Sequence, residues 1–308
     1  MRIFDLHCDT LFKFYENEQY YLSQNNGHIT DYGLAQGDYL AQCFAVYQPT
    51  DITGDSGFEF FKNQCEAFKN IVKGSSVLEF ATCKKDIERN RQNGKVSAVL
   101  TVENTDFLQG DISKIEAARE NGVRILGLTH NGENCLGFPH SVDRKLNAMP
   151  LKGFGCEVVD ALNSTNITVD VSHLNEGGFW DVKRLSKKPF VATHSGCTAV
   201  FGHSRNLNDE QIKAIAESGG VVGCVFYSHF LNGTDETRVD DIIRHLEHLV
   251  KVGGEDVAAF GSDFDGMECQ LFLQNASGMQ ILTDAVIQKF GHTVAEKLCF
   301  KNAMRIME

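Results

Sequence analysis

The fold is decided by the stretch VSAVLTVE, residues 96–103. It is apolar almost throughout, and VVGCVF at residues 221–226 has the same character. A strand with one face in water alternates apolar and polar residues, whereas a parallel strand buried on both faces is a nearly continuous apolar run. Both stretches therefore predict strands of a buried parallel sheet.

Short apolar runs of this kind alternate along the chain with longer segments of helical period. Parallel strands that alternate with helices predict a (β/α)8 barrel of the α/β class, and 308 residues suit one such barrel with loop insertions. With four prolines and no repeat or linker, residues 1–308 are expected to form a single domain. The predicted strands are Ile3–His7, Tyr39–Tyr47, Val96–Glu103, Ile125–Thr129, Ile167–Ser172, Phe190–His194, Val221–Phe226 and Val257–Ser262. The predicted helices are Gly57–Val72, Ile112–Asn121, Leu151–Asn163, Gly178–Leu185, Asp209–Glu217, Thr237–Val252, Leu282–Phe290 and His292–Ile306.

Two polar and irregular stretches interrupt this pattern, Tyr15–Asp38 and Gly132–Pro150. We expect both to be loops at the active site, because loops that follow barrel strands carry function.

Charge and composition exclude several classes of protein. The chain has 29 Lys and Arg against 41 Asp and Glu, a formal charge of −12, so an acidic surface argues against nucleic acid as a partner. The amino terminus lacks a signal-peptide pattern, and no apolar run approaches the roughly 20 residues that span a bilayer. We therefore expect a cytoplasmic protein without a membrane partner. The ten cysteines form no C-x-x-C pair, which predicts separate thiols and neither disulfides nor a zinc-thiolate site.

Polar side chains lie where the predicted strands end, and barrel active sites are built at these carboxyl ends. A single histidine there is more often a hydrogen-bonded structural residue, and a single aspartate is often a helix cap. Together on one rim, however, these residues predict one functional site: His7, Asp9, Glu103, His130, His173, His194 and Asp263.

Imidazole and carboxylate groups are the ligands that zinc and similar divalent ions prefer. Three histidines with two carboxylates can hold two ions, and Glu103 is the natural bridge between them. Two ions roughly 3.5–4 Å apart lower the pKa of a water between them and so supply a nucleophile at neutral pH. Asp263 could then take a proton and pass it to a leaving group. Spacing alone leaves open which histidines bind metal.

The segment DLHCD, residues 5–9, has its own internal pattern. Side chains of a strand alternate between faces, so His7 and Asp9 share one face and Cys8 points the other way. We expect Cys8 to lie in the layer between barrel and helices, away from any metal.

A wider pattern runs through almost the whole chain. Its segments, in chain order, are DLHCDT, VENTDFLQG, LTHNGENCLG, VDVSHL, ATHSG, GHSRNLNDEQIKAIAESGGVVG and GSDFDG. They resemble the renal (membrane) dipeptidase family, the M19 metallopeptidases of the amidohydrolase superfamily. The resemblance implies a hydrolase that cleaves dipeptides with two zinc ions.

The resemblance also implies a role for each matching residue. His7 and Asp9 would bind one Zn²⁺, and Glu103 would bridge to a second, held by His173 and His194. His130 would contact the substrate and stabilise the oxyanion, and Asp263 would be the acid/base. Arg205 would receive the free carboxylate of the dipeptide, a role that its planar fork suits. From the residues alone, Arg205 reads as a surface position in a loop.

The function expected from the resemblance is therefore a binuclear zinc dipeptidase that tolerates a D-residue at the carboxyl-terminal position. Two alternatives stay open: a related hydrolase of another amide, such as an N-acyl amino acid or a β-lactam-like ring, and a binding protein without activity. A homodimer is implied by analogy with the family. The other histidines are expected in surface, loop or packing positions, with His245 and His248 on a solvated helix face.

Overall fold

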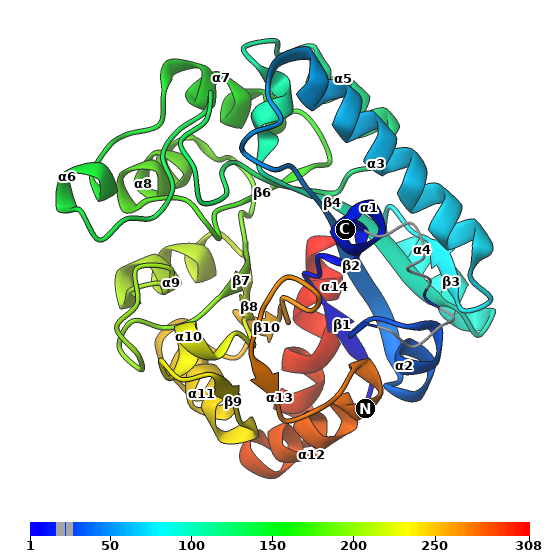
Figure 1. Cartoon of the computed structure of the whole chain (residues 1–308). Coiled ribbons are helices and arrows are strands. Elements are labelled where there is room, and N and C mark those ends of the chain that lie inside the picture. Colours follow the sequence, from blue (N-terminus) through cyan, green and yellow to red (C-terminus); the bar gives the residue numbers. More distant parts are fainter. Residues whose placement is uncertain (17–21, 23–26) are drawn as a thin grey trace.

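The parallel strands form an almost closed ring surrounded by helices in the computed structural model, which describes residues 1–16, 22 and 27–308 (Figure 1). Strand β10 pairs in parallel with both β8 and β1, so the last strand of the ring meets the first. Strand β6 meets the segment before β7 through an isolated bridge between Asp170 and Val191. The (β/α)8 architecture is therefore confirmed. In ring order the strands are β1 (Ile3–Asp5), β2 (Tyr39–Tyr47), β4 (Val96–Glu103), β5 (Ile125–Gly127), β6 (Thr168–Asp170), β7 (Ala192–Ser195), β8 (Val222–Cys224) and β10 (Ala258–Phe260).

Strands β2 and β4 begin and end as predicted, and they pair in register from Ala41 opposite Ser97 to Tyr47 opposite Glu103. The other strands are shorter than predicted, mostly at their carboxyl ends. There the backbone leaves the ladder and turns, which brings His7 and His173 onto the rim just beyond β1 and β6. The shortening is thus concentrated where the site is built.

The predicted helices are present with bounds that differ by a few residues. Helix α9 has the predicted bounds and starts with a capping box formed by Asn208 and Gln211. The last predicted helix is interrupted by a π-helical turn at Lys297–Lys301. The helices are α3 (Gly54–Gly74), α5 (Lys114–Glu120), α7 (Gly153–Leu162), α8 (Glu176–Leu185), α9 (Asp209–Glu217), α11 (Val239–Gly253), α12 (Met279–Phe290), α13 (His292–Glu296) and α14 (Asn302–Ile306).

Several short elements were not predicted. Within the expected loop Tyr15–Asp38, residues 17–21 and 23–26 lie outside the described residues, but α2 (Asp31–Gln36) shows that its last part is helical. The expected loop Gly132–Pro150 is irregular apart from α6 (Arg144–Asn147). The remaining additions are α1 (Thr10–Glu16), β3 (Leu78–Phe80), α4 (Lys84–Gln92), α10 (Ser228–Leu231), β9 (Glu236–Thr237) and β11 (Gln270–Leu271).

The buried apolar residues form two clusters. On β4, Val99 belongs to one cluster, whereas its neighbours Ala98 and Leu100 belong to the other, the outer layer, which also contains Phe61 of α3. Cys8 is fully buried and belongs to this outer layer, as expected. Leu6, two residues earlier, belongs to the first cluster, so the position of Cys8 follows from the turn of the backbone after β1 and not from strand alternation.

Helix α11 corrects one expectation, because His245 is buried and not solvated. Its Nδ1 accepts a hydrogen bond from the Cys197 amide at 2.9 Å, and its Nε2 lies 3.1 Å from the Leu231 carbonyl. The apolar residues Ile242 and Leu249 of this helix lie on the same stripe. His245 thus holds the loop after β7 against α11.

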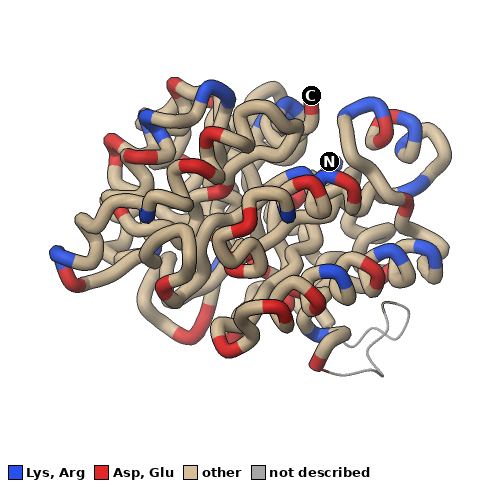
Figure 2. The backbone as a smooth tube through the Cα atoms, turned by 90° about the horizontal axis from the view of Figure 1, so that it is seen from above, with Lys and Arg blue, Asp and Glu red and all other residues tan. Residues whose placement is uncertain are grey.

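Charges are distributed over the whole molecule. Figure 2 shows Lys and Arg positions interspersed with Asp and Glu positions along the tube. Among the described residues, no helix combines the length and the apolar character needed to cross a bilayer. The cytoplasmic location stays a prediction.

Candidate metal centre

The five predicted metal ligands converge at the carboxyl end of the ring. His7 and Asp9 follow β1, Glu103 ends β4, His173 follows β6 and His194 lies in β7, and all five side chains are buried. Their donor atoms form overlapping groups in which all atoms lie within 4.8 Å of one another: His7 with Asp9 and Glu103, and Glu103 with His173 and His194. Residues from four strands of the ring therefore meet in one place.

Glu103 lies between the two groups of donors. Its Oε1 is 2.7 Å from His173 Nε2 and 3.4 Å from His194 Nε2. Its Oε2 faces the other way, 3.8 Å from His7 Nε2. One carboxylate thus presents each oxygen to a different set of nitrogen ligands.

The free atoms of this cluster suit a divalent cation. Asp9 Oδ1 is buried and makes no hydrogen bond with any described residue. His7 Nε2 makes none either, although it lies 3.3 Å from Asp9 Oδ2. A buried polar atom without a partner costs roughly 1–3 kcal/mol, so such atoms indicate a missing ligand. Imidazole nitrogens and carboxylate oxygens are donors for zinc and similar ions, and the residues present fit such a group.

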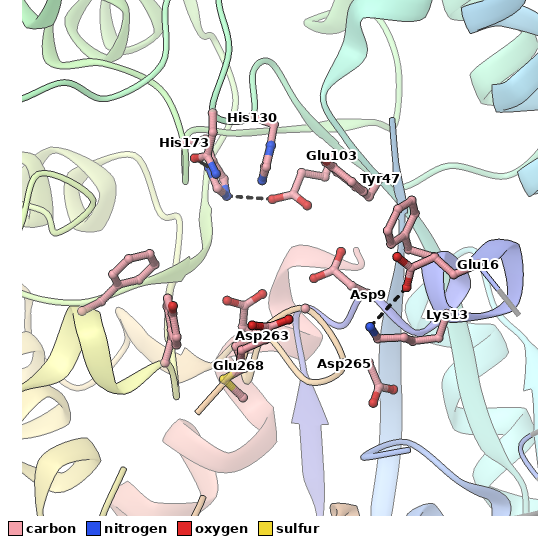
Figure 3. Close-up of a pocket in the computed structure, with 16 residues that line it drawn as sticks. Asp9, Lys13, Glu16, Tyr47, Glu103, His130, His173, Asp263, Asp265 and Glu268 are labelled. Carbon is pink, nitrogen blue, oxygen red and sulfur yellow. Dashed lines mark hydrogen bonds and ion pairs between the residues drawn. The ribbon is translucent and has the colours of Figure 1, made fainter. Parts of the chain in front are cut away.

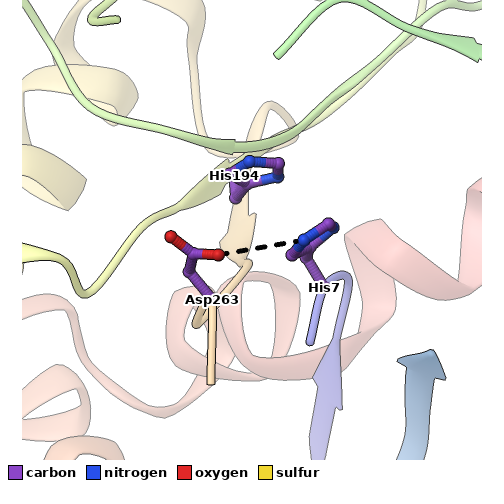
Figure 4. A group of neighbouring side chains, drawn as sticks. All are labelled: His7, His194 and Asp263. Atoms are coloured by element: carbon purple, nitrogen blue, oxygen red, sulfur yellow. Dashed lines mark ion pairs between the residues drawn. The ribbon is translucent and has the colours of Figure 1, made fainter. Parts of the chain in front are cut away.

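Asp263, which follows β10, forms a third such group, with His7 and His194. Its Oδ1 is 3.8 Å from His7 Nε2, and Figure 4 shows Asp263, His7 and His194 turned toward one another. The Asp263 backbone has a φ of 67°, a left-handed conformation that a residue other than glycine adopts at a cost of roughly 1–3 kcal/mol. This strained turn directs the carboxyl group into the site.

Close packing also constrains this corner. A Cβ on Gly266 would lie 1.9 Å from Asp9 Oδ2 and 3.1 Å from Asp263 Oδ1. The position of the Asp9 carboxylate therefore requires glycine here.

Burial and neighbouring charges shift the pKa values of Asp263 and His7. Burial, followed by the charge of Asp9, raises the pKa of the Asp263 carboxyl well above its ordinary value. Burial would lower the pKa of His7, but the charges of Asp9 and Glu103 outweigh it and raise that pKa to about 10. These pKa shifts apply to the chain without a bound ion. A bound cation would favour deprotonated carboxylates and neutral imidazole rings.

The opposite shift applies to the other two histidines. Burial lowers the pKa of His173 well below its ordinary value, and Arg205 adds to this effect. Burial lowers the pKa of His194 in the same way, with a smaller contribution from His7. Both rings are therefore neutral, which is the form that binds metal.

The cluster opens into a cavity of about 440 Å³ at the top of the ring (Figure 3). His130, which follows β5, lines this cavity with its ring 4.5 Å from that of His173 and 4.7 Å from that of Tyr47. Burial lowers the pKa of His130. The cavity is also lined by Phe12, Lys13, Glu16, Asn131, Tyr227, Phe230, Asp265, Met267 and Glu268.

Arg205 is buried, which differs from the surface position that the residues alone suggested. It lines a second cavity, with His203 and Asn206, and not the described cavity that opens from the metal cluster. Its guanidinium donates to the main-chain carbonyls of Ser172 and His194, the latter at 3.1 Å, and lies 5.3 Å from the Phe230 ring centre. Its Nε atom is buried without a hydrogen-bond partner among the described residues. Burial lowers the pKa of Arg205 to about 10, which leaves it charged at neutral pH.

Comparison with known proteins decides the family. The sequence model of the membrane dipeptidases (peptidase family M19) matches residues 1–308. The chain belongs to this family. It is therefore a metallohydrolase of the dipeptidase type.

Two relatives are about one third identical to the chain, and one of them is named a dipeptidase. The chain is 32% identical to an uncharacterized protein in the pqqA 5′ region of Klebsiella pneumoniae, over 77% of this chain and 91% of that one. It is 30% identical to an uncharacterized dipeptidase of Schizosaccharomyces pombe, over 75% of this chain and 55% of that one.

Solved structures of M19 proteins have the same architecture. A metallopeptidase described as dipeptidase AC has a TM-score of 0.93 at 27% identity, over 100% of this chain and 98% of that one. A metallopeptidase of Rhodobacter sphaeroides, liganded with a phosphinate mimic of the dipeptide L-Ala-D-Ala, has a TM-score of 0.92 at 26% identity, with the same coverage.

Sequence reasoning about this M19 chain missed the residues that support the ligands. Asn131 places its Oδ1 3.0 Å from His173 Nδ1, and Thr193 places its Oγ1 3.0 Å from His194 Nδ1. Both are next to residues that were singled out, so adjacency to a rim histidine was an available signal. Gly266 had no such signal, because its closeness to Asp9 depends on the fold.

Proposed function

We propose that this chain is a binuclear zinc dipeptidase that hydrolyses the peptide bond of dipeptides and accepts a D-residue at the carboxyl-terminal position. The observation that carries the proposal is the placement of Glu103, whose two oxygens face different nitrogen ligands beside an open cavity. Family membership supports dipeptide hydrolysis, and the dipeptide mimic on the Rhodobacter sphaeroides protein supports the D-residue.

In this proposal His7 and Asp9 would hold one Zn²⁺, His173 and His194 would hold the other, and Glu103 would contribute to both sites. Bound zinc ions polarise a carbonyl and lower the pKa of water, which supplies a nucleophile at neutral pH. A phosphinate is tetrahedral at phosphorus, like the transition state of amide hydrolysis, so binding of such a mimic by a relative fits this chemistry.

The residues of the chain supply the remaining steps. Asp263 lines the cavity beside His7, and its carboxylate can take a proton and deliver it to the departing amine. His130 is neutral, lines the cavity and can donate a hydrogen bond to the carbonyl oxygen as negative charge develops there. Arg205 contributes a buried positive charge that attracts the free carboxylate of the dipeptide.

A dipeptide panel tests the proposal. Zinc-loaded protein is assayed with dipeptides that carry an L- or a D-residue at the carboxyl-terminal position, beside N-acyl amino acids and a β-lactam. We expect hydrolysis of dipeptides in both series. Zinc-loaded protein that cleaves none of the dipeptides would defeat the proposal, and cleavage confined to the other amides would replace it.

Arg205→Ala tests recognition of the carboxylate. Activity is compared on a dipeptide and on the same dipeptide with an amidated carboxyl terminus. We expect a large loss confined to the free carboxylate, because the charge pair is absent from the amide. Equal losses on both would show instead that Arg205 acts through the Ser172 and His194 carbonyls.

A further inference from the structure

Two buried aspartates make the same contacts at two places in the ring. Asp5 of β1 accepts hydrogen bonds at Oδ1 from the His7 and Ser262 amides, and at Oδ2 from the Ser262 hydroxyl at 2.5 Å. Asp170 of β6 accepts at Oδ1 from the Ser172 and Thr193 amides, and at Oδ2 from the Thr193 hydroxyl at 2.6 Å. Each aspartate thus binds the residue on the neighbouring strand that comes directly before Asp263 or His194.

The direction of the hydrogen bonds around Asp170 follows from its chemistry. A carboxylate has no hydrogen to donate, so a contact of 2.6 Å requires that the Thr193 hydroxyl gives its hydrogen to Asp170. The Ser172 hydroxyl also lies 2.6 Å from Asp170 Oδ1 and gives its hydrogen there. Thr193 Oγ1 has then given its hydrogen away, so it can only accept a hydrogen bond in its contact with His194 Nδ1 at 3.0 Å. His194 Nδ1 must therefore carry the hydrogen, and Nε2 is bare.

We infer that Asp170, acting through Thr193, is a positioning residue that sets the tautomer of His194 and so directs a bare Nε2 at the metal. The inference rests on the proposed function in that His194 is taken as a zinc ligand. His194 Nε2 lies 3.4 Å from Glu103 Oε1 and 2.9 Å from His173 Nε2, at the centre of the proposed site. A ring nitrogen that carries a hydrogen cannot bind a metal ion, so the tautomer decides whether His194 is a ligand.

Asp5 provides a matched control in the same chain. The Ser262 hydroxyl contacts Asp5 Oδ2, the His7 carbonyl at 3.2 Å and the Phe264 amide. If Asp5 is replaced by Asn, the Ser262 hydroxyl can give its hydrogen to the His7 carbonyl. If Asp170 is replaced by Asn, the new amide donates to Thr193 Oγ1, and the hydroxyl turns to another acceptor, His194 Nδ1 at 3.0 Å or Ser172 Oγ at 3.1 Å. His194 Nδ1 is the nearer of the two, and a hydroxyl that donates to it moves the hydrogen of His194 to Nε2.

The experiment measures zinc retained per chain against a series of chelator concentrations. The proteins are the zinc-loaded wild type, Asp170→Asn, Thr193→Val, Thr193→Ser and Asp5→Asn, each checked for a native circular dichroism spectrum. We expect Asp170→Asn and Thr193→Val to bind zinc about 10–100-fold more weakly, the usual effect of removing a partner of a metal-bound histidine. Thr193→Ser keeps the hydroxyl and is expected to match the wild type, and Asp5→Asn is expected to lose much less.

The outcomes separate this inference from its rivals. Unchanged zinc binding in Thr193→Val, failure of Thr193→Ser to match the wild type, or an equal loss in Asp5→Asn would each overturn it. If Asp170→Asn does not fold, the zinc affinity of Thr193→Val is measured together with the ¹⁵N chemical shifts of the His194 ring. These shifts report which ring nitrogen carries the hydrogen. Zinc affinity is measured without substrate, so it does not depend on turnover. A protein that binds zinc but cleaves no dipeptide would defeat the proposed function, and the zinc affinities of the variants would still test the role of Asp170.

Discussion

The two sides of the metal centre are built in different ways. The carboxylate side, His7, Asp9 and Asp263, comes from the first and last strands of the ring and has a left-handed backbone at Asp263 and atoms without partners. The imidazole side, His173 and His194, has a hydrogen-bond partner for each outer ring nitrogen. The pKa of His7 is raised to about 10, whereas burial lowers the pKa values of His173 and His194. The imidazole side is thus prepared for a cation, and the carboxylate side supplies negative charge and the group that moves a proton.

The largest expected effect separates proton transfer from metal binding on the carboxylate side. Asp263→Asn is expected to lower kcat by about 10²–10⁴-fold, the usual contribution of a general acid or base, with zinc content unchanged. Assays of dipeptide hydrolysis and analysis of the zinc content check this. His173→Ala is the comparison variant, and it is expected to lose zinc as well as activity. Loss of zinc from Asp263→Asn would mean that Asp263 is itself a ligand.

The next effect tests the dependence of the carboxylate side on close packing. Gly266→Ala places a Cβ 1.9 Å from Asp9 Oδ2, so Asp9 must move. Zinc affinity is expected to fall by about 10–100-fold, as when the support of a ligand is lost. Gly153→Ala is the control, because open space surrounds that glycine. Equal zinc affinity in the two variants would show that Asp9 is free to shift.

A smaller effect concerns the loop that follows the imidazole side. Burial lowers the pKa of His245 from 6.5 to about 4, so the unfolded chain takes up this proton first as pH falls. The contribution to stability is complete above pH 6.5, is lost between about pH 6.5 and 4, and amounts to about 2–3 kcal/mol. Denaturant unfolding at pH 7 and 4.5 measures it. His245→Gln should show a smaller difference between the two pH values, and an unchanged difference would assign it to other groups.

The smallest effect lies next to two proposed ligands. Cys8→Ser is expected to keep all bound zinc and to lower the free energy of unfolding by about 1 kcal/mol, because a hydroxyl is buried in the outer layer with the Thr10 hydroxyl as its partner. Metal analysis and denaturant unfolding check both parts. A Cys8→Ser protein that loses zinc would show that Cys8 contributes to the carboxylate side.

The sequence predicted the ring and the convergence of the rim residues because long apolar strands are unambiguous. Strands β2 and β4 have the predicted bounds, and Glu103 was found because it ends β4. Strand β3 was missed because three residues, one of them Glu79, carry too little pattern. The prediction for His245 was wrong because its three-residue spacing from His248 does not show which face of the helix is buried, whereas Ile242 and Leu249 on the same stripe do.

The supporting contacts were beyond sequence reasoning for a physical reason. Whether Thr193 reaches His194 Nδ1, or Gly266 touches Asp9, depends on side-chain rotamers and on loops that leave the ladder. Neither leaves a periodic pattern. The left-handed backbone of Asp263 suits its residue type, because Asp and Asn adopt this conformation more readily than other residues besides glycine, but the sequence does not show which aspartates adopt it.

The pairing of β1 with β10, in which Asp5 lies opposite Phe260, bears on how the centre forms during synthesis. The five proposed ligands all lie within the first 194 residues, but β1, which leads into His7 and Asp9, gains its second neighbour only when β10 has been made. Since domains fold as units, we expect the ligands to be held in place only after the last strand of the ring has joined the first.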